Sequence, residues 1–428
     1  MFKKILSLAL VVVMCLSLAA MFGSCAQNGD SDVEKTRKEK GILDTFTASP
    51  ISDAAKAELK IGFIFLHDEN STYDKNFMDA ARRAQAELGL TNDQVLFEVG
   101  IPETAECYEA AKRLVAKGCQ VVFADSFGHE SFMIQAAKEY PNVQFCHATG
   151  TQAHTVNLAN FHNAFASIYE GRYVAGIVAG MKLNEMIAAG KITAEQAKMG
   201  YVGAFPYAEV KSGYTSFYLG AKSVCPSVTM EVRYTNSWYD ESKEKETAVA
   251  LIGSGCVLIS QHADSMGAPT ACEEAKVPNV SYNGSTTTAC PNTALISSYI
   301  DWAPYFLYMI GCVANNQEIH DDFCGGFAAG SVKMTALNTA VAAEGTQAAI
   351  DAAIAQFKAG TLKVFDVEKD NFITVGGKKL TEYAADVDSD EAYAKDTHVV
   401  WDGAFLESYF RSAPYFDIVI DGITANEG

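Results

Sequence analysis

From residue 58 onward, short apolar runs alternate with longer stretches in which apolar residues recur three and four positions apart. Runs of the first kind predict strands, and stretches of the second kind predict helices. In the first half of the chain the predicted strands are 59–66, 95–99, 120–124 and 143–147, and the predicted helices between them are 75–88, 104–117 and 130–139. This alternation is typical of a parallel, doubly wound sheet with helices on both faces.

The pattern begins again after a long apolar stretch, 160–183, which predicts a helix. The strands predicted next are 198–204, 228–235, 256–260 and 280–282, and the helices are 208–223, 241–253 and 267–275. An aromatic segment follows residue 300, then a predicted helix over 346–359 and a β-rich tail. Two successive α/β units predict two similar Rossmann-like lobes.

The order of these elements predicts the domain organisation. We expect lobe 1 to contain 58–160 plus about 296–330, lobe 2 to contain 161–295 plus about 331–385, and residues 386–428 to form a packed C-terminal appendage. Open α/β sheets bind ligands beyond the carboxyl ends of their strands. We therefore expect a ligand cleft between the lobes, closed by a hinge.

The N-terminus carries an export pattern. Lys3 and Lys4 form a basic head, residues 5–22 are apolar, and Gly-Ser-Cys follows at 23–25. This pattern predicts a signal peptide over residues 1–24 and resembles a bacterial lipoprotein signal, with Phe22 where the usual motif has Leu. Cys25 is then the acylated residue, and 25–57 is a flexible tether that anchors an extracytoplasmic body to the membrane. The alternative is an uncleaved anchor helix, because 18 apolar residues almost span a bilayer.

Charge and residue usage exclude several classes of protein. The 428 residues include 33 Lys and Arg against 52 Asp and Glu, a formal charge of −19, which disfavours nucleic-acid binding. The cysteines and histidines show no metal-ligand spacing, so we expect no metal and no cofactor, and the nine body cysteines cannot all pair within one chain. No GxSxG elbow, P-loop or GxGxxG after the first strand is present, so we expect a protein that is not an enzyme.

Several segments in order resemble one known family. They are 70–77 (NSTYDKNF), 125–128 (DSFG), 147–150 (HATG), 169–176 (YEGRYVAG), 202–206 (VGAFP), 235–240 (TNSWYD), 261–265 (QHADS) and 302–305 (WAPY). Together they resemble the basic membrane protein (BMP) family of substrate-binding lipoproteins of ABC importers, from about residue 58 to about 385. The resemblance implies a type I periplasmic-binding fold, a purine ligand, and ABC permease and ATPase subunits as partners.

The resemblance also implies which residues bind the ligand. It implies that Tyr73 and Trp238 stack on the purine, and stacking stabilises binding by roughly 1–3 kcal/mol per base. The expected ligand-binding set is Tyr73, Asp74, Ser126, Phe127, Trp238, Asp264, Asn283, Asp301 and Trp302. Other roles remain open, because lone aromatics often pack in a core, and Asp74 and Asp264 each stand where an N-cap is common. Trp302 is either a wall of the pocket or a buried hinge residue.

Two departures from the nucleoside-binding branch of the family favour a nucleobase. That branch has a ribose-gripping Asp where this chain has Asn283, and its Lys has no counterpart in 297–302. The segment 302–305 instead resembles the branch associated with nucleobases such as adenine. Three alternatives remain: a nucleoside ligand, a sensory surface receptor that is not coupled to transport, and a sugar-binding protein of the same fold.

Overall fold

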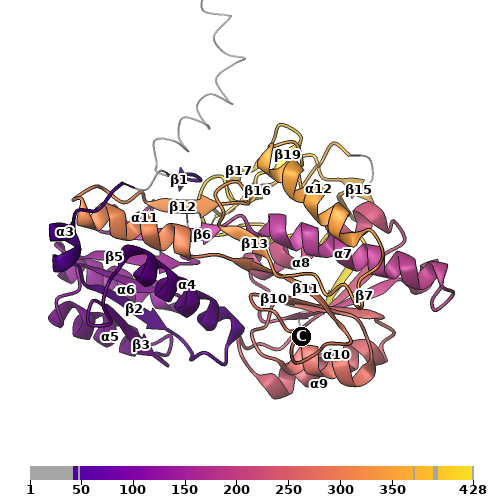
Figure 1. The fold of residues 1–428 in the computed structure, drawn as a ribbon. Coiled ribbons are helices and arrows are strands. Elements are labelled where there is room, and N and C mark those ends of the chain that lie inside the picture. The colour runs from indigo at the N-terminus through magenta and orange to yellow at the C-terminus, as the bar shows by residue number, and fades with distance from the viewer. Residues whose placement is uncertain (1–41, 47–48, 370–371, 389–393, 427–428) are drawn as a thin grey trace, which may run out of the picture.

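The computed structural model describes residues 42–46, 49–369, 372–388 and 394–426 (Figure 1). The expected signal peptide and Cys25 lie outside these residues. Part of the expected tether is described and carries structure. Ile42–Leu43 forms strand β1, and Asp53–Glu58 forms helix α3, whose first turn is capped when Ser52 Oγ accepts from the Ala55 amide at 3.2 Å. The expectation of a tether without structure over 25–57 is therefore wrong for these residues.

The first lobe is a parallel sheet with helices on both faces. Its strand order is β1, β12, β6, β5, β4, β2, β3. The further strands are β12 Asp322–Gly325, β6 Phe161–Ala166, β5 Gln144–Ala148, β4 Val121–Ala124, β2 Ile61–Phe65 and β3 Val95–Val99. Its helices are α4 Thr72–Leu88, α5 Ala105–Ala116, the short η1 Phe127–His129, α6 Glu130–Glu139 and α11 Ala303–Ala314. Every residue of β2 and β4 is buried, as expected for strands covered on both faces.

The second lobe repeats this plan. Its strand order is β13, β11, β10, β9, β7, β8, β20. Among the described strands of this sheet, only β13 runs antiparallel to its neighbour. The strands are β13 Val332–Met334, β11 Ala294–Ile300, β10 Asn279–Tyr282, β9 Leu258–Gln261, β7 Lys198–Gly203, β8 Thr229–Tyr234 and β20 Ile423–Asn426. The helices are α7 Ile168–Ala188, the short η2 Ala194–Gln196, α8 Ala208–Val224, α9 Glu241–Gly253, α10 Gly267–Ala275 and α12 Thr346–Lys358. Two parallel α/β sheets confirm the expected fold class.

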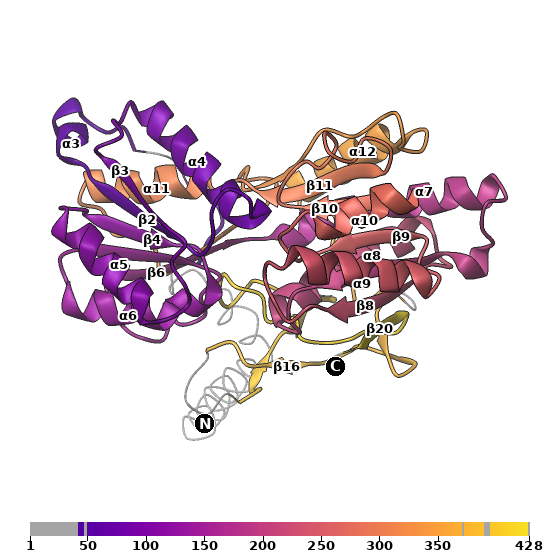
Figure 2. The same cartoon turned by 90° about the horizontal axis from the view of Figure 1, so that it is seen from below.

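The chain crosses between the lobes at positions that differ from those expected. β6 pairs with β5 and β12, so 161–166 belongs to the first sheet and not to a helix that begins at residue 160. All six residues of β6 are buried, and an apolar run without alternation does not distinguish a buried strand from a buried helix. β11 extends to Ile300 within the second sheet, and α11 then lies beside the first lobe (Figure 2). The return to lobe 1 is thus after residue 300 rather than at about 296.

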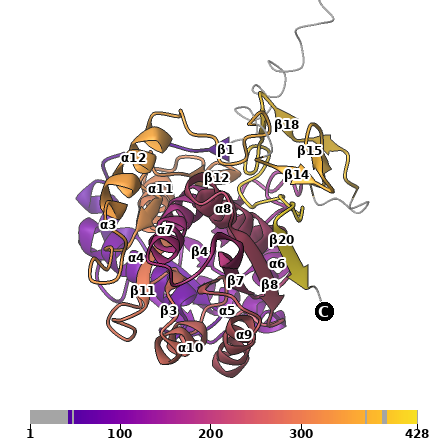
Figure 3. The same ribbon diagram turned by 90° about the vertical axis from the view of Figure 1, so that its right-hand side faces the viewer.

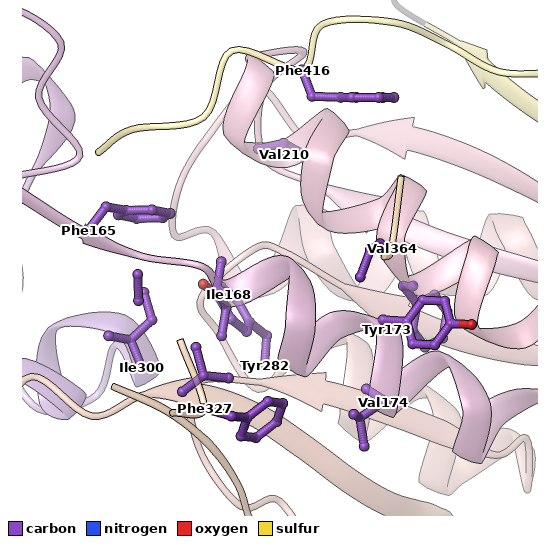
Figure 4. Close-up of a cluster of buried hydrophobic side chains, with 14 of the residues drawn as sticks. Phe165, Ile168, Tyr173, Val174, Val210, Tyr282, Ile300, Phe327, Val364 and Phe416 are labelled. Carbon is purple, nitrogen blue, oxygen red and sulfur yellow. The ribbon is translucent and has the colours of Figure 1, made fainter. Parts of the chain in front are cut away.

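The crossover segments are packed into a continuous apolar core. Phe165 and Ile300 lie at or next to the ends of the strands that lead out of each sheet, and Ile168 and Phe327 lie near them (Figure 4). All four belong to the same buried cluster, which extends through both lobes. The hinge is therefore a packed region and not a loose linker.

The C-terminal residues are part of the second lobe. β20 pairs with β8 in parallel, from Ile423 opposite Met230 onward, and lies at the edge of the sheet (Figure 3). Short hairpins precede it: β14 Thr374–Val375 with β15 Lys378–Lys379, β16 Ala384–Ala385 with β17 Thr397–His398, and β18 Val400–Trp401 with β19 Ala404–Phe405. The expectation that 386–428 is an appendage is wrong at this point, because its last strand completes the main sheet.

Candidate functional site

A cavity with about 360 Å³ of empty space, part of it open to solvent, lies between the lobes. Its walls come from both sheets, and most of the lining residues follow the carboxyl end of a parallel strand, where open α/β sheets bind ligands. The lining residues are Leu66, His67, Tyr73, Asp74, Ser126, Phe127, Thr149, Glu209, Trp238, His262 and Asp264.

The two lobes touch each other beside this cavity. The Thr72 amide and the Thr72 hydroxyl both donate to the Asp264 carbonyl, each at 3.0 Å. The rings of Phe127 and Tyr207, one from each lobe, have centroids 5.5 Å apart. The structure therefore has a closed cleft, in which a small ligand would be enclosed.

An aromatic side chain faces the cavity from each lobe. Tyr73, in the first turn of α4, packs edge-on against Phe77 at 4.8 Å and donates its hydroxyl to the Asp125 carbonyl at 2.8 Å. Burial raises the pKa of Tyr73 well above its ordinary value, so the phenol is neutral. Trp238, after β8, packs edge-on against Phe205 at 5.1 Å. Both rings are thus held in place by neighbours in their own lobe.

The carboxyl groups of lobe 1 form a coupled pair. The Asp74 carboxylate accepts from the His67 amide at 2.7 Å and from Ser71 Oγ at 2.5 Å. Burial alone would raise the pKa of Asp74, but the hydrogen bonds from His67 and Ser71 outweigh burial and hold the pKa below its ordinary value. Burial, and then the charge of Asp74, raise the pKa of Asp125 well above its ordinary value. Asp74 is therefore the more acidic member of the pair and holds the negative charge more readily than Asp125.

Asp264 contributes a carboxyl group from lobe 2. Burial raises the pKa of Asp264 well above its ordinary value, and the charges of Asp74, Glu244 and Glu209 raise it further. A protonated carboxyl both donates and accepts hydrogen bonds. The protonated form of Asp264, which burial favours, can pair with a ring nitrogen that lacks a proton, and either form can accept from an N–H group.

Ser126 and Phe127 complete the part of the expected set that lines the cavity. Ser126 Oγ donates to Glu103 Oε1 at 2.6 Å, which fixes the turn after β4. The Phe127 side chain is 40% exposed and extends across the mouth of the cleft toward Tyr207. Six of the nine expected residues thus line the same cavity: Tyr73, Asp74, Ser126, Phe127, Trp238 and Asp264.

The other three expected residues do not line this cavity. Trp302 is 1% exposed and stacks on Phe77 with ring centroids 4.3 Å apart, which makes it a core residue of lobe 1. Asp301 binds Arg83 Nη2 at 2.6 Å and Lys333 Nζ at 2.5 Å, so it joins α4 of one lobe to β13 of the other. Asn283 is buried after β10, and its Nδ2 has no hydrogen-bond partner among the described residues.

Sequence reasoning missed five lining residues: Leu66, His67, Thr149, Glu209 and His262. His67, Thr149 and His262 lie within one or two residues of a strand's carboxyl end, and that position was the available signal. Thr149 also has a φ of 64°, which is unusual for a β-branched residue. Glu209 gave no such signal, because an acid in the first turn of a helix is common on structural grounds alone.

The described residues contain no cluster of His, Cys, Asp or Glu that could hold a metal ion. Within the same part of the chain, no helix is both long and apolar enough to cross a membrane. The nine cysteines found there are buried free thiols. Burial raises the pKa of several of them, to about 12 for Cys146, which keeps these thiols protonated.

Two doubly wound lobes with a cavity between them define the type I periplasmic-binding class. Among solved structures, an ABC transporter solute-binding protein of Aeropyrum pernix K1 superposes with a TM-score of 0.60, at 16% identity over 73% of this chain and 94% of that one. The sequence model of a protein family described as "ABC transporter substrate-binding protein PnrA-like" (Bmp) matches residues 64–363. The chain belongs to this family, as the sequence resemblance predicted. It is a solute-binding protein of an ABC transporter and not an enzyme.

Two curated relatives differ in the ligand that their names give. A purine-binding protein of Brucella abortus is 32% identical over 298 residues, which cover 68% of this chain and 80% of that protein. A putative ABC transporter glucose-binding protein of Haloferax volcanii is 34% identical over 210 residues, which cover 49% of this chain and 50% of that protein.

Proposed function

We propose that the cavity binds a purine, and that the preferred ligand is a nucleobase such as adenine. The observation that carries this proposal is a cavity between the lobes with an aromatic ring from each lobe, Tyr73 and Trp238, and carboxyl groups at its edge. Flat aromatic walls suit the π-faces of a purine, and carboxyl groups suit its N–H donors and ring nitrogens. The similarity to the purine-binding protein of Brucella abortus supports the same ligand class. The six lining residues of the expected set are the proposed contacts.

A nucleobase is favoured over a nucleoside because of the residue at one position. The resemblance places a ribose-gripping Asp of the nucleoside-binding branch at Asn283, which does not line the cavity. A nucleoside remains the second candidate.

The proposed setting is the outer face of a cell membrane. We propose that Cys25 carries the lipid anchor and that ABC permease and ATPase subunits receive the ligand from the closed protein. The alternative is a receptor that passes ligand binding on to a signalling partner. Ligand uptake by cells, compared with uptake by cells that lack the permease, distinguishes these two roles.

A hexose is the candidate from a ligand class other than the purines. The relative from Haloferax volcanii, whose name gives glucose, favours it over about half of the chain. Aromatic walls also stack against sugar rings. The hexose proposal is weaker because the similarity to the relative from Haloferax volcanii covers 49% of this chain, whereas the similarity to the purine-binding protein covers 68%.

Calorimetric titration with adenine, guanine, adenosine, inosine and glucose tests the proposal. We expect a saturable signal with adenine that is at least as tight as with adenosine. Tight glucose binding without any purine signal would replace the ligand class. Adenosine binding far tighter than adenine would keep the purine and reverse the choice between base and nucleoside.

A further inference from the structure

A fully buried arginine lies beneath the ligand cavity. Arg172, in the second turn of α7, is 0% exposed, and its guanidinium lies 4.6 Å from the centroid of the Tyr282 ring. Nη2 donates to the Gln261 carbonyl at 2.8 Å and to the Tyr201 hydroxyl. Among the described residues no carboxylate forms an ion pair with it, and its Nε and Nη1 have no hydrogen-bond partner. Burial lowers the pKa of Arg172 to about 10, so the group remains charged at neutral pH.

Burying a charge without a counter-ion is costly, so this arginine is not explained by stability alone. Its contacts point toward the cavity instead. Tyr201 Oη lies 3.4 Å from His262 Nδ1, and His262 Nε2 lies 3.4 Å from Glu209 Oε1. Both His262 and Glu209 line the cavity. A chain of polar groups thus runs from Arg172 to the cavity wall.

The chemistry of the groups fixes the direction of every hydrogen bond in this chain. A guanidinium only donates, so the Tyr201 oxygen accepts from Arg172. The Tyr201 proton is then available to His262 Nδ1 when this ring nitrogen carries no proton. Burial lowers the pKa of His262, which favours the neutral ring, and its one proton then lies on Nε2, the nitrogen that faces the Glu209 carboxylate. That proton is donated to Glu209, and a carboxylate only accepts.

A glycine in α8 leaves space for the His262 ring. A Cβ atom added to Gly213 of α8 would lie 2.8 Å from His262 Nδ1 and 3.6 Å from the Tyr201 hydroxyl. A side chain here would therefore displace the imidazole. The glycine keeps the helix close enough for the hydrogen bond between Tyr201 and His262.

Glu209 presents the end of the chain to the cavity. It is the second residue of α8, where the helix dipole favours a negative charge, and its side chain is 12% exposed. Its charge contributes to the raised pKa of Tyr73 and of Asp264, which face the same cavity from opposite lobes. The carboxylate is therefore close to both of these proposed contacts.

We propose that Glu209 is a specificity-determining residue that accepts a hydrogen bond from an N–H group of the ligand, and that Arg172, Tyr201 and His262 are positioning residues that hold it. This inference rests on the proposed purine ligand and deepens it. An N–H donor is present on the exocyclic amine of adenine and on the ring of every free purine base. A hydrogen bond to a charged acceptor is about twice as strong as a neutral one.

Nitrogen NMR of the full chain labelled with ¹⁵N-histidine tests the positioning part without any ligand. His262→Gln assigns the resonance. In the unsubstituted protein we expect a single tautomer of His262, with the proton on Nε2. Tyr201→Phe should give a mixture of tautomers. The matched control is Tyr282→Phe, since this ring also packs against His262, at 4.8 Å, but its hydroxyl has no hydrogen-bond partner among the described residues. It should leave the single tautomer unchanged. A proton on Nδ1 in the unsubstituted protein, or an unchanged tautomer in Tyr201→Phe, would overturn the positioning part.

Titration with adenine tests the specificity part. Glu209→Gln should weaken adenine binding roughly 10- to 100-fold, since a charged hydrogen bond is lost, and Tyr201→Phe should weaken it roughly 3- to 10-fold. Tyr282→Phe should bind as the unsubstituted protein does, and thermal unfolding of each variant checks the fold. Unchanged adenine binding by Glu209→Gln would overturn the specificity part. If the unsubstituted protein binds no purine, the proposed ligand fails and the specificity part fails with it, whereas the tautomer measurement still decides the positioning part.

Discussion

The Trp238 ring lines the cavity and is fixed by packing against residues of its own lobe. The ring lies between the cavity and Phe205, so one face or edge is already packed before a ligand arrives. A ligand then needs to order little of this wall, and the stacking energy is kept as affinity.

We therefore expect Trp238→Ala to weaken adenine binding by roughly 1–3 kcal/mol, about 5- to 150-fold. Trp238→Phe should recover most of the loss, because the π-face is retained. Trp401→Ala is the control, since Trp401 lies in the short hairpin of β18 and β19 and does not line the cavity. Calorimetric titration measures all three. Equal affinities of Trp238→Ala and the unsubstituted protein would remove Trp238 from the site.

Asp301 acts at the hinge instead of in the cavity. It accepts from Arg83 of α4 and from Lys333 of β13, and its carboxylate also accepts from the Ala303 amide at 3.0 Å. Burial alone would raise the pKa of Asp301, but the bonds from Lys333 and Ala303 and the charge of Arg83 outweigh burial and lower the pKa. The charged form is therefore bound more tightly in the folded state than in the unfolded state.

Asp301→Asn should lower the free energy of unfolding by roughly 1–2 kcal/mol at pH 7, because the amide still accepts a hydrogen bond but carries no charge. The folded-state pKa lies below the unfolded value, so the stabilisation is complete above about pH 4 and is lost as the pH falls through the folded-state pKa. Denaturant unfolding at pH 7 and at lower pH should show the two proteins converging in acid. Asp79→Asn is the control on the same helix, since its pair with Lys75 is half exposed on both sides. A difference that is constant with pH would contradict the ionic role.

At the scale of single residues, the sequence predicted which residues follow the end of a strand better than it predicted which way their side chains point. Asp264 and Trp302 both follow strands, yet one faces the cavity and the other fills the core against Phe77. That difference depends on the residues that pack around each turn, and those come from distant parts of the chain. The partners of His262 and Glu209 could not be predicted for the same reason.

At the scale of elements, alternation predicted most strands and helices to within a few residues, because parallel strands and amphipathic helices differ in length and period. It failed for β6, which is buried on both faces, and it did not separate β11, α11, β12 and β13 within the stretch that follows β10. The tail was predicted to be β-rich, but its two-residue strands between 374 and 405 are too short to show a period. Alternation also failed for β20, whose pairing with β8 joins segments far apart in the sequence.

β20 makes the C-terminal residues a structural part of lobe 2. We expect Ile423→Ala to lower the free energy of unfolding by about 2 kcal/mol, since Ile423 is 7% exposed at the edge of the sheet. Thr424→Ala, the next residue, is the control, because its side chain is exposed and should change the value by less than about 0.5 kcal/mol. Denaturant unfolding measures both. An equally small effect of the two substitutions would mean that β20 contributes little to the lobe.

At the scale of the whole molecule, the two lobes, the cavity between them and the hinge serve one function. The lobes close on each other through Thr72 and Asp264, and the hinge between them is packed and ionically linked at Asp301. The fold class and the two-lobed plan could be predicted from the sequence, because the same α/β pattern occurs twice. The points at which the chain crosses between lobes could not, because strands of either lobe look alike in sequence.

The membrane anchor is the remaining property of the whole molecule that the sequence predicts. Cleavage before Cys25 would remove two Lys and no acid, so the charge of the processed chain is 31 − 52 = −21. Such a chain is repelled by an anionic membrane surface. Stable attachment would then depend on the acyl chains, and two chains hold far better than one.

We therefore expect the unsubstituted protein to sediment with membranes and to remain there in high salt, which screens charges but not acyl chains. Cys25→Ser should release the protein into the supernatant. Cys15→Ser is the matched control, since Cys15 lies within the apolar run and should leave attachment unchanged. Metabolic labelling with a fatty acid should mark the unsubstituted protein and the control but not Cys25→Ser. Continued sedimentation of Cys25→Ser with membranes, without label in any of the three proteins, would instead identify residues 5–22 as an uncleaved anchor helix.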